Sequence, residues 1–427
     1  MHELTQLIRT DMKPALGVTE PGAIAYAVST ARSYLRGKAD RIHLRLNSGM
    51  FKNAFTCGIP GSRHIGNEYA AALGLVMADP KKELLCLEGV TPEDEHRAEA
   101  MVAEGRVTVE MAGITSRIYI EASVISVRET VSVTIRDTHT NIVRITRNGE
   151  VLSEASGPEA DAEEEEPPLI HRYTLAQILE YVQNVPAEEI AFLTEAYEVN
   201  LKLFHEGLGS NRTTFAPMLY QKNGNNVISD DELQTASLLC NAAIEARVIG
   251  LSRPAMSITG SGAHGIIATL PLYAVYKVYG CSEEALHRAT ALSYLICMYI
   301  KEYSGKLSAF CGCAIAAGTG MACGVVWLKG GDPEAVARTI DNMSASITGM
   351  ICDGGNQGCT MKGIVAVDAA FRSAELALGG AYILPEHGIN ADTPEKTMRN
   401  MGRIAAPGMT GTEETILEIL EEKRKVL

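Results

Sequence analysis

The chain has 427 residues, of which 46% are hydrophobic, and a formal net charge of −14. This length allows about two or three domains with a sizeable core. The acidic balance, without a long Lys/Arg run, disfavours nucleic acid and anionic membrane surfaces as partners. The first residues lack an apolar h-region, and no stretch of about 18 apolar residues follows. We therefore expect no signal peptide, no transmembrane helix and a cytoplasmic location.

Residues 1–152 predict an α+β domain. Helical patterns cover residues 3–13, 22–36, 62–78 and 92–105, and Thr91 has the position of an N-cap before Pro92. Strand-like alternation occurs at 41–46, 106–111, 117–128, 130–137 and 141–146, and Asn148-Gly149 predicts a hairpin turn. Because helices and strands are segregated, we expect an antiparallel sheet.

The following segment, residues 153–170, is acidic and rich in Pro and Gly. Such a segment has little to bury, so it predicts a flexible linker or exposed loop, and a regulatory or docking segment is the alternative. Residues 171–427 have helical patterns almost throughout and predict an all-α domain. Its Ala/Gly-rich stretch AIAAGTGMACGVVWL is apolar nearly all round, which predicts a central helix. A helical domain rich in small residues often forms a homodimer.

Three cysteines in this second domain are the strongest functional signal. Cys311 lies in LSAFCGCAIAAG, and Cys352 and Cys359 lie in GMICDGGNQGCTMK. Without a secretion signal, metal or redox chemistry is favoured over disulfides. Three thiolates leave one iron of a cubane cluster without a protein ligand, and such an iron can act as a Lewis acid on a substrate hydroxyl or thiol. Spacing alone does not decide between Cys311 and Cys313 as the first ligand.

Six other cysteines are expected to be small core residues, since cysteine is among the most buried residue types: Cys57, Cys86, Cys240, Cys281, Cys297 and Cys323.

Five segments in order carry a resemblance to a known family: GVTEPGAIA, MFKNAFTCGIPG, GSGAHGIIATLP, LSAFCGCA and GMICDGGNQGCTMK. Over essentially the whole chain, the sequence resembles the L-cysteine desulfidase family, long labelled an uncharacterised protein family. That family is related to the α part of bacterial iron–sulfur L-serine dehydratases.

The resemblance implies an oxygen-sensitive [4Fe–4S] cluster held by Cys311, Cys352 and Cys359. It also implies α,β-elimination of L-cysteine to sulfide and aminoacrylate, which hydrolyses to pyruvate and ammonia. An L-serine dehydratase that eliminates water is the close alternative. Coordination to iron would make the thiol or hydroxyl a better leaving group, and a base must remove the Cα proton.

Two of the motifs depart from the family pattern. Val18 stands where the family usually has a cysteine, which favours a third hypothesis: a catalytically silent homologue that binds or senses a small amino acid. Ala263 and His264 replace two amides, and His264 could serve as the base because imidazole titrates near neutrality. The C-terminal sequence EEKRKVL lacks the cysteine with which related serine dehydratases reach the cluster.

The remaining candidates surround a small amino-acid substrate. Glu20 is predicted to hold its ammonium or to orient a base, and Thr19 beside it is predicted to bind substrate. Further candidates for the substrate are Lys52, Asn53, Ser261, Gly262 and Lys362. Backbone N–H groups at a helix start suit a carboxylate, which is the argument for Ser261 and Gly262. The alternatives are that Glu20 is only an exposed acid and that Lys52 and Asn53 are ordinary loop residues. Likewise, Ser261 and Gly262 could form a plain glycine turn, and Lys362 could be a solvated lysine.

Overall fold

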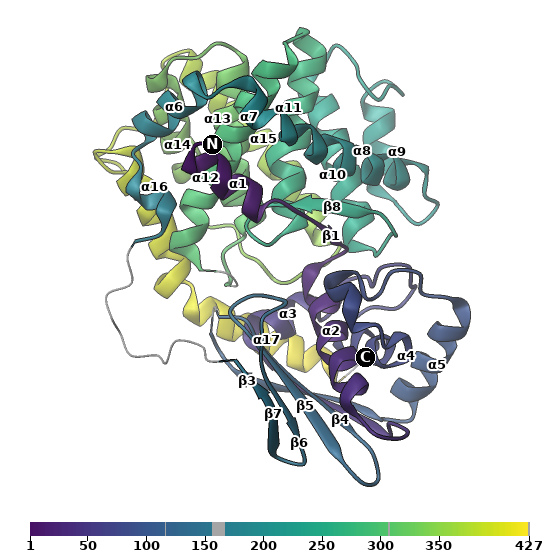
Figure 1. The fold of residues 1–427 in the computed structure, drawn as a ribbon. Helices are drawn as coiled ribbons and strands as arrows, with labels where there is room; N and C mark the ends of the chain where they lie inside the picture. The colour runs from purple at the N-terminus through teal and green to yellow at the C-terminus, as the bar shows by residue number, and fades with distance from the viewer. Residues whose placement is uncertain (116, 156–166, 306–307, 426–427) are drawn as a thin grey trace.

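The computed structural model describes residues 1–115, 117–155, 167–305 and 308–425. It contains a sheet part and a helical part that lie side by side (Figure 1). The predicted order, an α+β region followed by a helical region, is confirmed. Most of the predicted acidic linker, residues 156–166, lies outside the described residues.

The sheet part is built on a six-stranded sheet in the order β3-β2-β4-β5-β6-β7. All neighbours are antiparallel except β2 and β3, so the sheet is mixed rather than wholly antiparallel. A parallel pair needs a long crossover, and three helices between β2 and β3 provide it. The strands are β2 (Arg41–Asn47), β3 (Val107–Gly113), β4 (Tyr119–Ile125), β5 (Thr130–Arg136), β6 (Ile142–Arg147) and β7 (Glu150–Glu154).

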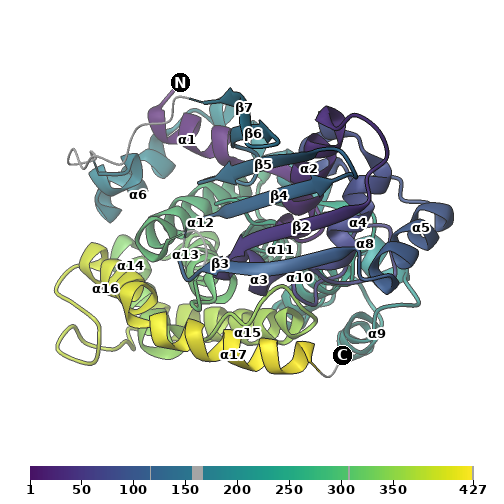
Figure 2. The same ribbon diagram turned by 90° about the horizontal axis from the view of Figure 1, so that it is seen from below.

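One face of this sheet is covered by helices. Ile120, Ala122 and Val124 of β4 are buried, whereas Glu121 between them is only partly covered. Alternation of this kind is typical of a sheet with one solvated face. Helix α2 (Thr19–Tyr34) packs across β4 and β5, and α4 (Asn67–Met77) packs against α2 and β3. Helix α5 (Pro92–Ala103) packs against α4, and Figure 2 shows α2 behind the sheet and α5 beyond its end.

Several predicted boundaries are corrected. The helix expected at 3–13 ends at Asp11 as α1 (Glu3–Asp11), because Pro14 disfavours helical backbone at the residue before it. The helix expected from residue 22 begins at Thr19, since proline is tolerated in a first turn. The helix expected from residue 62 begins only at Asn67. The N-cap Thr91 and the Asn148-Gly149 turn are confirmed.

In the helical part, α13 (Gly318–Leu328) is central and packs against α11, α12, α14 and α15, as its apolar sequence predicted. No helix in the described ranges is long and apolar enough to cross a membrane. The helices are α6 (Leu175–Asn184), α7 (Ala187–Ile190), α8 (Thr194–Gly209), α9 (Phe215–Lys222), α10 (Glu232–Val248), α11 (Gly262–Tyr279), α12 (Glu283–Ser304), α14 (Pro333–Ile347), α15 (Gly358–Leu378) and α16 (Pro394–Arg403). Shorter helical turns are η1 (Pro80–Leu85), η2 (Leu169–Arg172), η3 (Ala191–Leu193), η4 (Cys313–Ala317) and η5 (Ile404–Gly408).

Both ends of the chain cross between the two parts (Figure 1). The N-terminal strand β1 (Lys13–Leu16) pairs antiparallel with β8 (Pro254–Ser257), a short strand that the sequence did not predict within the helical region. The C-terminal helix α17 (Thr410–Arg424) packs against α3 (Ser48–Ala54) of the sheet part. Both ends of the chain therefore help to hold the two parts together.

Candidate functional site

Two of the predicted cluster ligands lie on neighbouring extended segments. Phe310 and Ile351 form an antiparallel bridge. The Cys311 N–H donates to the Met350 carbonyl at 3.1 Å, and the Cys352 N–H donates to the Ala309 carbonyl at 2.6 Å. This pairing of distant segments brings the two cysteines to one place. Directly after Cys311, residues 313–317 form a π-helix, a rare element that is frequent at functional sites.

Cys311 and Cys352 act electrostatically on the neighbouring thiols. Burial, together with the charges of Cys352 and Cys311, raises the pKa of Cys359 to about 12. The pKa of Cys352 is also raised by burial and by Cys311, whereas Lys52 and Lys362 lower it. The hydrogen bond with Cys313 is the main reason that the pKa of Cys311 is well above its ordinary value. The three predicted ligands therefore belong to one group, and Cys313 touches it.

The donor chemistry of the three cysteines suits an iron–sulfur cluster. Across the described ranges, no three His, Cys, Asp or Glu side chains converge closely enough to hold one metal ion. In a cubane each cysteine binds a different iron, so its ligands are spaced more widely. Thiols whose pKa is raised by burial and mutual repulsion are the groups that a cationic centre would deprotonate. The chemistry and grouping of Cys311, Cys352 and Cys359 therefore fit the cluster that the sequence predicted.

The loop that carries Cys352 and Cys359 packs on the end of α3. The Gly355 N–H donates to the Asn53 carbonyl at 3.1 Å. Gly354 has φ +113°, and a Cβ there would lie 2.5 Å from the Lys52 carbonyl oxygen. Only glycine fits this conformation and this close approach. The Cys352 thiol lies 4.0 Å from Oδ1 of Asn53, so the sheet part forms one wall of the site.

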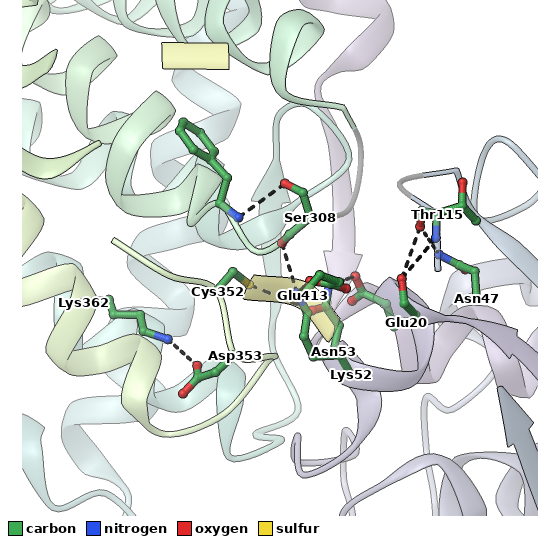
Figure 3. A network of polar contacts seen from close by, with 12 residues as sticks. Glu20, Asn47, Lys52, Asn53, Thr115, Ser308, Cys352, Asp353, Lys362 and Glu413 are labelled. Carbon is green, nitrogen blue, oxygen red and sulfur yellow. Dashed lines mark hydrogen bonds and ion pairs between the residues drawn. The ribbon is translucent and has the colours of Figure 1, made fainter. Parts of the chain in front are cut away.

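Both predicted lysines are ion-paired (Figure 3). Lys52 Nζ lies 2.5 Å from Glu413 Oε2 of α17 and donates to the Ser308 carbonyl at 3.0 Å. Lys362 pairs with Asp353, beside Cys352. Both lysines act on the Cys352 thiol, so they place positive charge next to the predicted ligands. Glu413 was missed from the sequence because no local pattern connects the C-terminal helix to α3.

Glu20 and Thr19 lie in the first turn of α2, on another side of the site. The Asn53 side-chain amide donates to Glu20 Oε1 at 2.8 Å, and the Glu20 side chain is buried. Thr19 Oγ1 donates to the Gly260 carbonyl at 3.3 Å, which connects the first motif to the turn before α11. Glu20, Asn53 and the turn at Gly260 are thus brought together from three distant segments.

His264 lies in the first turn of α11 and points one ring nitrogen at the cysteine segment. A Cβ on Gly312, between Cys311 and Cys313, would lie 2.8 Å from His264 Nε2. At the other nitrogen, Nδ1 is hydrogen-bonded to Thr259 Oγ1, whose own hydrogen is donated to the Ile258 carbonyl. With the Thr259 hydrogen donated to Ile258, this arrangement favours a proton on Nδ1 and leaves Nε2 as the basic atom.

The pKa of His264 favours this neutral form. Burial is the main cause that holds it well below its ordinary value, and Lys301 and Arg247 lower it further. Desolvation and neighbouring cations both disfavour a charged imidazole.

Val18 and Cys57 also line the site. Val18 is buried as the N-cap of α2, and a Cβ on Gly355 would lie 2.9 Å from Val18 Cγ1. A cysteine at this position would therefore face the ligand loop. Cys57 was expected to be only a core residue. Burial raises its pKa, and Glu20, Arg247 and Cys359 all act on it, so it lies between charged groups of the site.

Ser261 is the N-cap of α11 and Gly262 is its first residue, as the glycine turn predicted. Arg247 of α10 packs against this turn. It was not predicted as a site residue, because an arginine near a helix end is ordinary. Two surface cavities, of about 570 and 830 Å³, are lined by other residues and include none of the predicted site residues.

The chain is similar in sequence to several known proteins. The serine dehydratase alpha chain family matches residues 81–418. A UPF0597 protein of Clostridium botulinum (strain Okra / Type B1) is 41% identical over 428 residues, which cover 99% of each chain. A UPF0597 protein of Caldanaerobacter subterraneus subsp. tengcongensis is 35% identical over 99% of this chain and 98% of its own. A UPF0597 protein of Oleidesulfovibrio alaskensis is 38% identical over 98% of this chain and 97% of its own.

Proposed function

The chain belongs to the serine dehydratase alpha chain family, and from this membership we propose that it is an iron–sulfur-dependent lyase acting on L-cysteine. The reaction would eliminate hydrogen sulfide from L-cysteine. The aminoacrylate that remains would take up water and give pyruvate and ammonia. The family relation supports a lyase of amino-acid catabolism, and the choice of L-cysteine rests on the motif resemblance.

The observation that carries the proposal is the grouping of three cysteines from two distant segments. The backbone pairing of residues 309–311 with 350–352 supports it, as do the effects of Cys311 on the pKa of Cys352 and of both thiols on the pKa of Cys359. Cys311, Cys352 and Cys359 would hold a [4Fe–4S] cluster. When bound, such a cluster supplies a Lewis acid that makes a thiol or hydroxyl a better leaving group.

The protein's own residues would hold the substrate and move the proton. Glu20, oriented by Asn53, would bind the substrate ammonium, since its carboxylate is buried beside the ligand loop. His264 would take the Cα proton at Nε2, the atom that faces Gly312. Burial of these groups would exclude water and strengthen each electrostatic contact.

The remaining predicted residues would support this arrangement. Lys52 and Lys362 would balance the negative charge of the thiolates, because each already lowers the pKa of Cys352. For either lysine to bind the substrate carboxylate, the substrate would have to compete with Glu413 or Asp353. Thr19 would hold the turn at Gly260, next to Ser261 and Gly262 of the α11 N-terminus.

The test is pyruvate and sulfide release from L-cysteine by protein reconstituted with iron and sulfide under strict anaerobiosis. We expect both products in equal amounts, and none from a Cys352→Ala control treated identically. Pyruvate from L-serine in preference to L-cysteine would identify a dehydratase instead, the activity that the family name favours. Protein that holds its cluster but forms no pyruvate from either would support a silent amino-acid-binding homologue, for which Val18 is the specific observation.

A further inference from the structure

Arg247, near the end of α10, is a buried charge without a partner in the described part of the chain. Arg247 is 5% exposed, and its Nε atom is buried without a hydrogen-bond acceptor. Among the described residues, its guanidinium makes no hydrogen bond or ion pair. An arginine side chain stays protonated and offers five N–H donors, so a buried one normally has an anionic or carbonyl partner.

The other buried charges nearby do have partners. Lys52 is paired with Glu413. Glu245, two residues before Arg247, is fully buried, but it accepts N–H groups from Thr214 at 2.6 Å and Ala216 at 2.8 Å at the start of α9. Glu245 is therefore satisfied elsewhere and does not neutralise Arg247. Among the described residues, no acidic side chain therefore neutralises Arg247.

The guanidinium lies against the N-terminus of α11. A Cβ on Gly262 would be 2.9 Å from Arg247 Nε and 3.4 Å from Cδ, so the glycine leaves room for the side chain. The first turn of an 18-residue helix adds a positive dipole end and unpaired N–H groups. Two independent features, a helix start and a buried unpartnered cation, thus converge at one point.

That point adjoins the predicted catalytic groups. The charge of Arg247 acts on both His264 and Cys57. Glu20 acts on the same Cys57 thiol with the opposite sign. A buried cation and a buried anion are therefore both within electrostatic reach of one thiol, beside the cysteine loop.

We propose that Arg247, together with the first turn of α11, binds the α-carboxylate of the amino-acid substrate. This inference rests on the proposed function, because it assigns the carboxylate of that substrate while Glu20 takes its ammonium. A guanidinium binds a carboxylate through two parallel N–H···O bonds, which fixes orientation as well as charge. The pair of opposite charges selects zwitterionic α-amino acids over amines and amides.

The experiment is calorimetric titration of the anaerobically reconstituted protein with L-alanine and with L-alaninamide. Neither has a leaving group, so binding is measured without turnover, and the two ligands differ only in the carboxylate charge. We expect the wild type to prefer L-alanine. Arg247→Gln should weaken L-alanine binding about 30-fold or more and change L-alaninamide binding far less. The L-alanine affinity of Arg247→Lys should lie between those of the wild type and Arg247→Gln. The matched control is Arg253→Gln, at an exposed arginine, which should change the affinity for neither ligand.

A second variant tests the geometry without removing a charge. Gly262→Ala places its Cβ against Arg247 and should also weaken L-alanine binding selectively. The inference is overturned if the wild type does not prefer L-alanine to L-alaninamide, or if Arg247→Gln weakens both ligands equally or neither. It is also overturned if Arg247→Gln loses its iron while L-alanine affinity is unchanged, because Arg247 would then be a counter-charge of the cluster.

The two proposals fail in different ways. If the wild type prefers L-alanine through Arg247 yet releases no pyruvate, the lyase is wrong and the carboxylate site stands. If it releases pyruvate while Arg247→Gln binds L-alanine normally, the lyase stands and the carboxylate site is wrong.

Discussion

Lys52 of α3 and Glu413 of α17 form an ion pair inside the protein. Their Nζ and Oε2 atoms are 2.5 Å apart, and the two side chains are 0% and 6% exposed. The pair fastens the C-terminal helix to the helix that carries Asn53, which itself touches Cys352. A contact between residues separated by 361 positions thus supports one wall of the candidate site.

Glu413→Gln should destabilise the protein strongly, because it leaves the Lys52 ammonium buried without a counter-charge. Removal of one partner of a buried ion pair typically lowers the free energy of unfolding by about 3–5 kcal/mol. The measurement is the midpoint of guanidinium-induced unfolding, followed by circular dichroism.

A matched control is the exposed pair Arg372–Glu375, whose side chains are 69% and 67% exposed. Glu375→Gln should leave the midpoint unchanged, since exposed ion pairs contribute little. Equal shifts of the unfolding midpoint in the two variants would show that the buried Lys52–Glu413 pair stabilises the protein no more than an exposed pair does.

Replacement of any one of the three predicted ligands should abolish stable cluster binding. Cys311→Ala, Cys352→Ala and Cys359→Ala should each retain little iron after anaerobic reconstitution and desalting, because a cubane held by two thiolates is easily lost. Cys313→Ala should retain the iron and acid-labile sulfide of the wild type. If Cys311→Ala retained its iron and Cys313→Ala lost it, Cys313 rather than its hydrogen-bonded neighbour Cys311 would be the first ligand.

His264→Gln should lower kcat about 100-fold or more, the usual contribution of a general base, while the iron content stays at the wild-type level. His287→Gln is the control, because His287 is also a buried helical histidine but pairs with Thr194 away from the site. Similar losses in both variants would mark a general structural effect rather than a base.

Val18→Cys tests the competing assignment of the base. Since His264 Nε2 already faces the cysteine segment, we expect kcat to change by less than about tenfold, below the effect of a general base. A gain of several orders of magnitude would instead identify Val18 as the reason for low activity and the introduced thiol as the acid or base.

Asp341 should make stability depend on pH between about pH 4 and 6. Burial raises its pKa to about 6, and the hydrogen bond from Thr397 lowers it only in part. A carboxyl group whose pKa is higher in the folded state stabilises the protein below its unfolded pKa, and this stability is lost as the pH rises through the folded value.

From pH 4 to pH 7, the wild type should therefore lose about 2 kcal/mol of unfolding free energy relative to Asp341→Asn. Asparagine can still accept the Thr397 hydrogen bond and has no charge at either pH. Parallel pH profiles of the two proteins would show that Asp341 titrates normally in the folded state.

Local features of the fold were predictable because they depend on residues close in sequence. The Thr91 cap needs only its own hydroxyl and the backbone N–H of Asp94, and the hairpin needs positive φ only at Asn148 and Gly149. The parallel pairing of β2 and β3 and the strand β8 were not predictable in this way. They depend on which distant segment is available as a neighbour, and four residues carry too little pattern.

For the candidate site, the donor chemistry was readable from the residues alone: three cysteines on glycine-rich segments, an acid beside a proline and a histidine after a glycine turn. Which of these groups meet depends on how distant segments pack. The packing brings Cys311 beside Cys352 through a backbone bridge and buries Lys52 against Glu413. It also encloses Arg247 of α10 against the start of α11 without a partner among the described residues. The physical reason is that side-chain chemistry belongs to each residue, whereas burial and electrostatic partners arise only when distant segments pack together and exclude water.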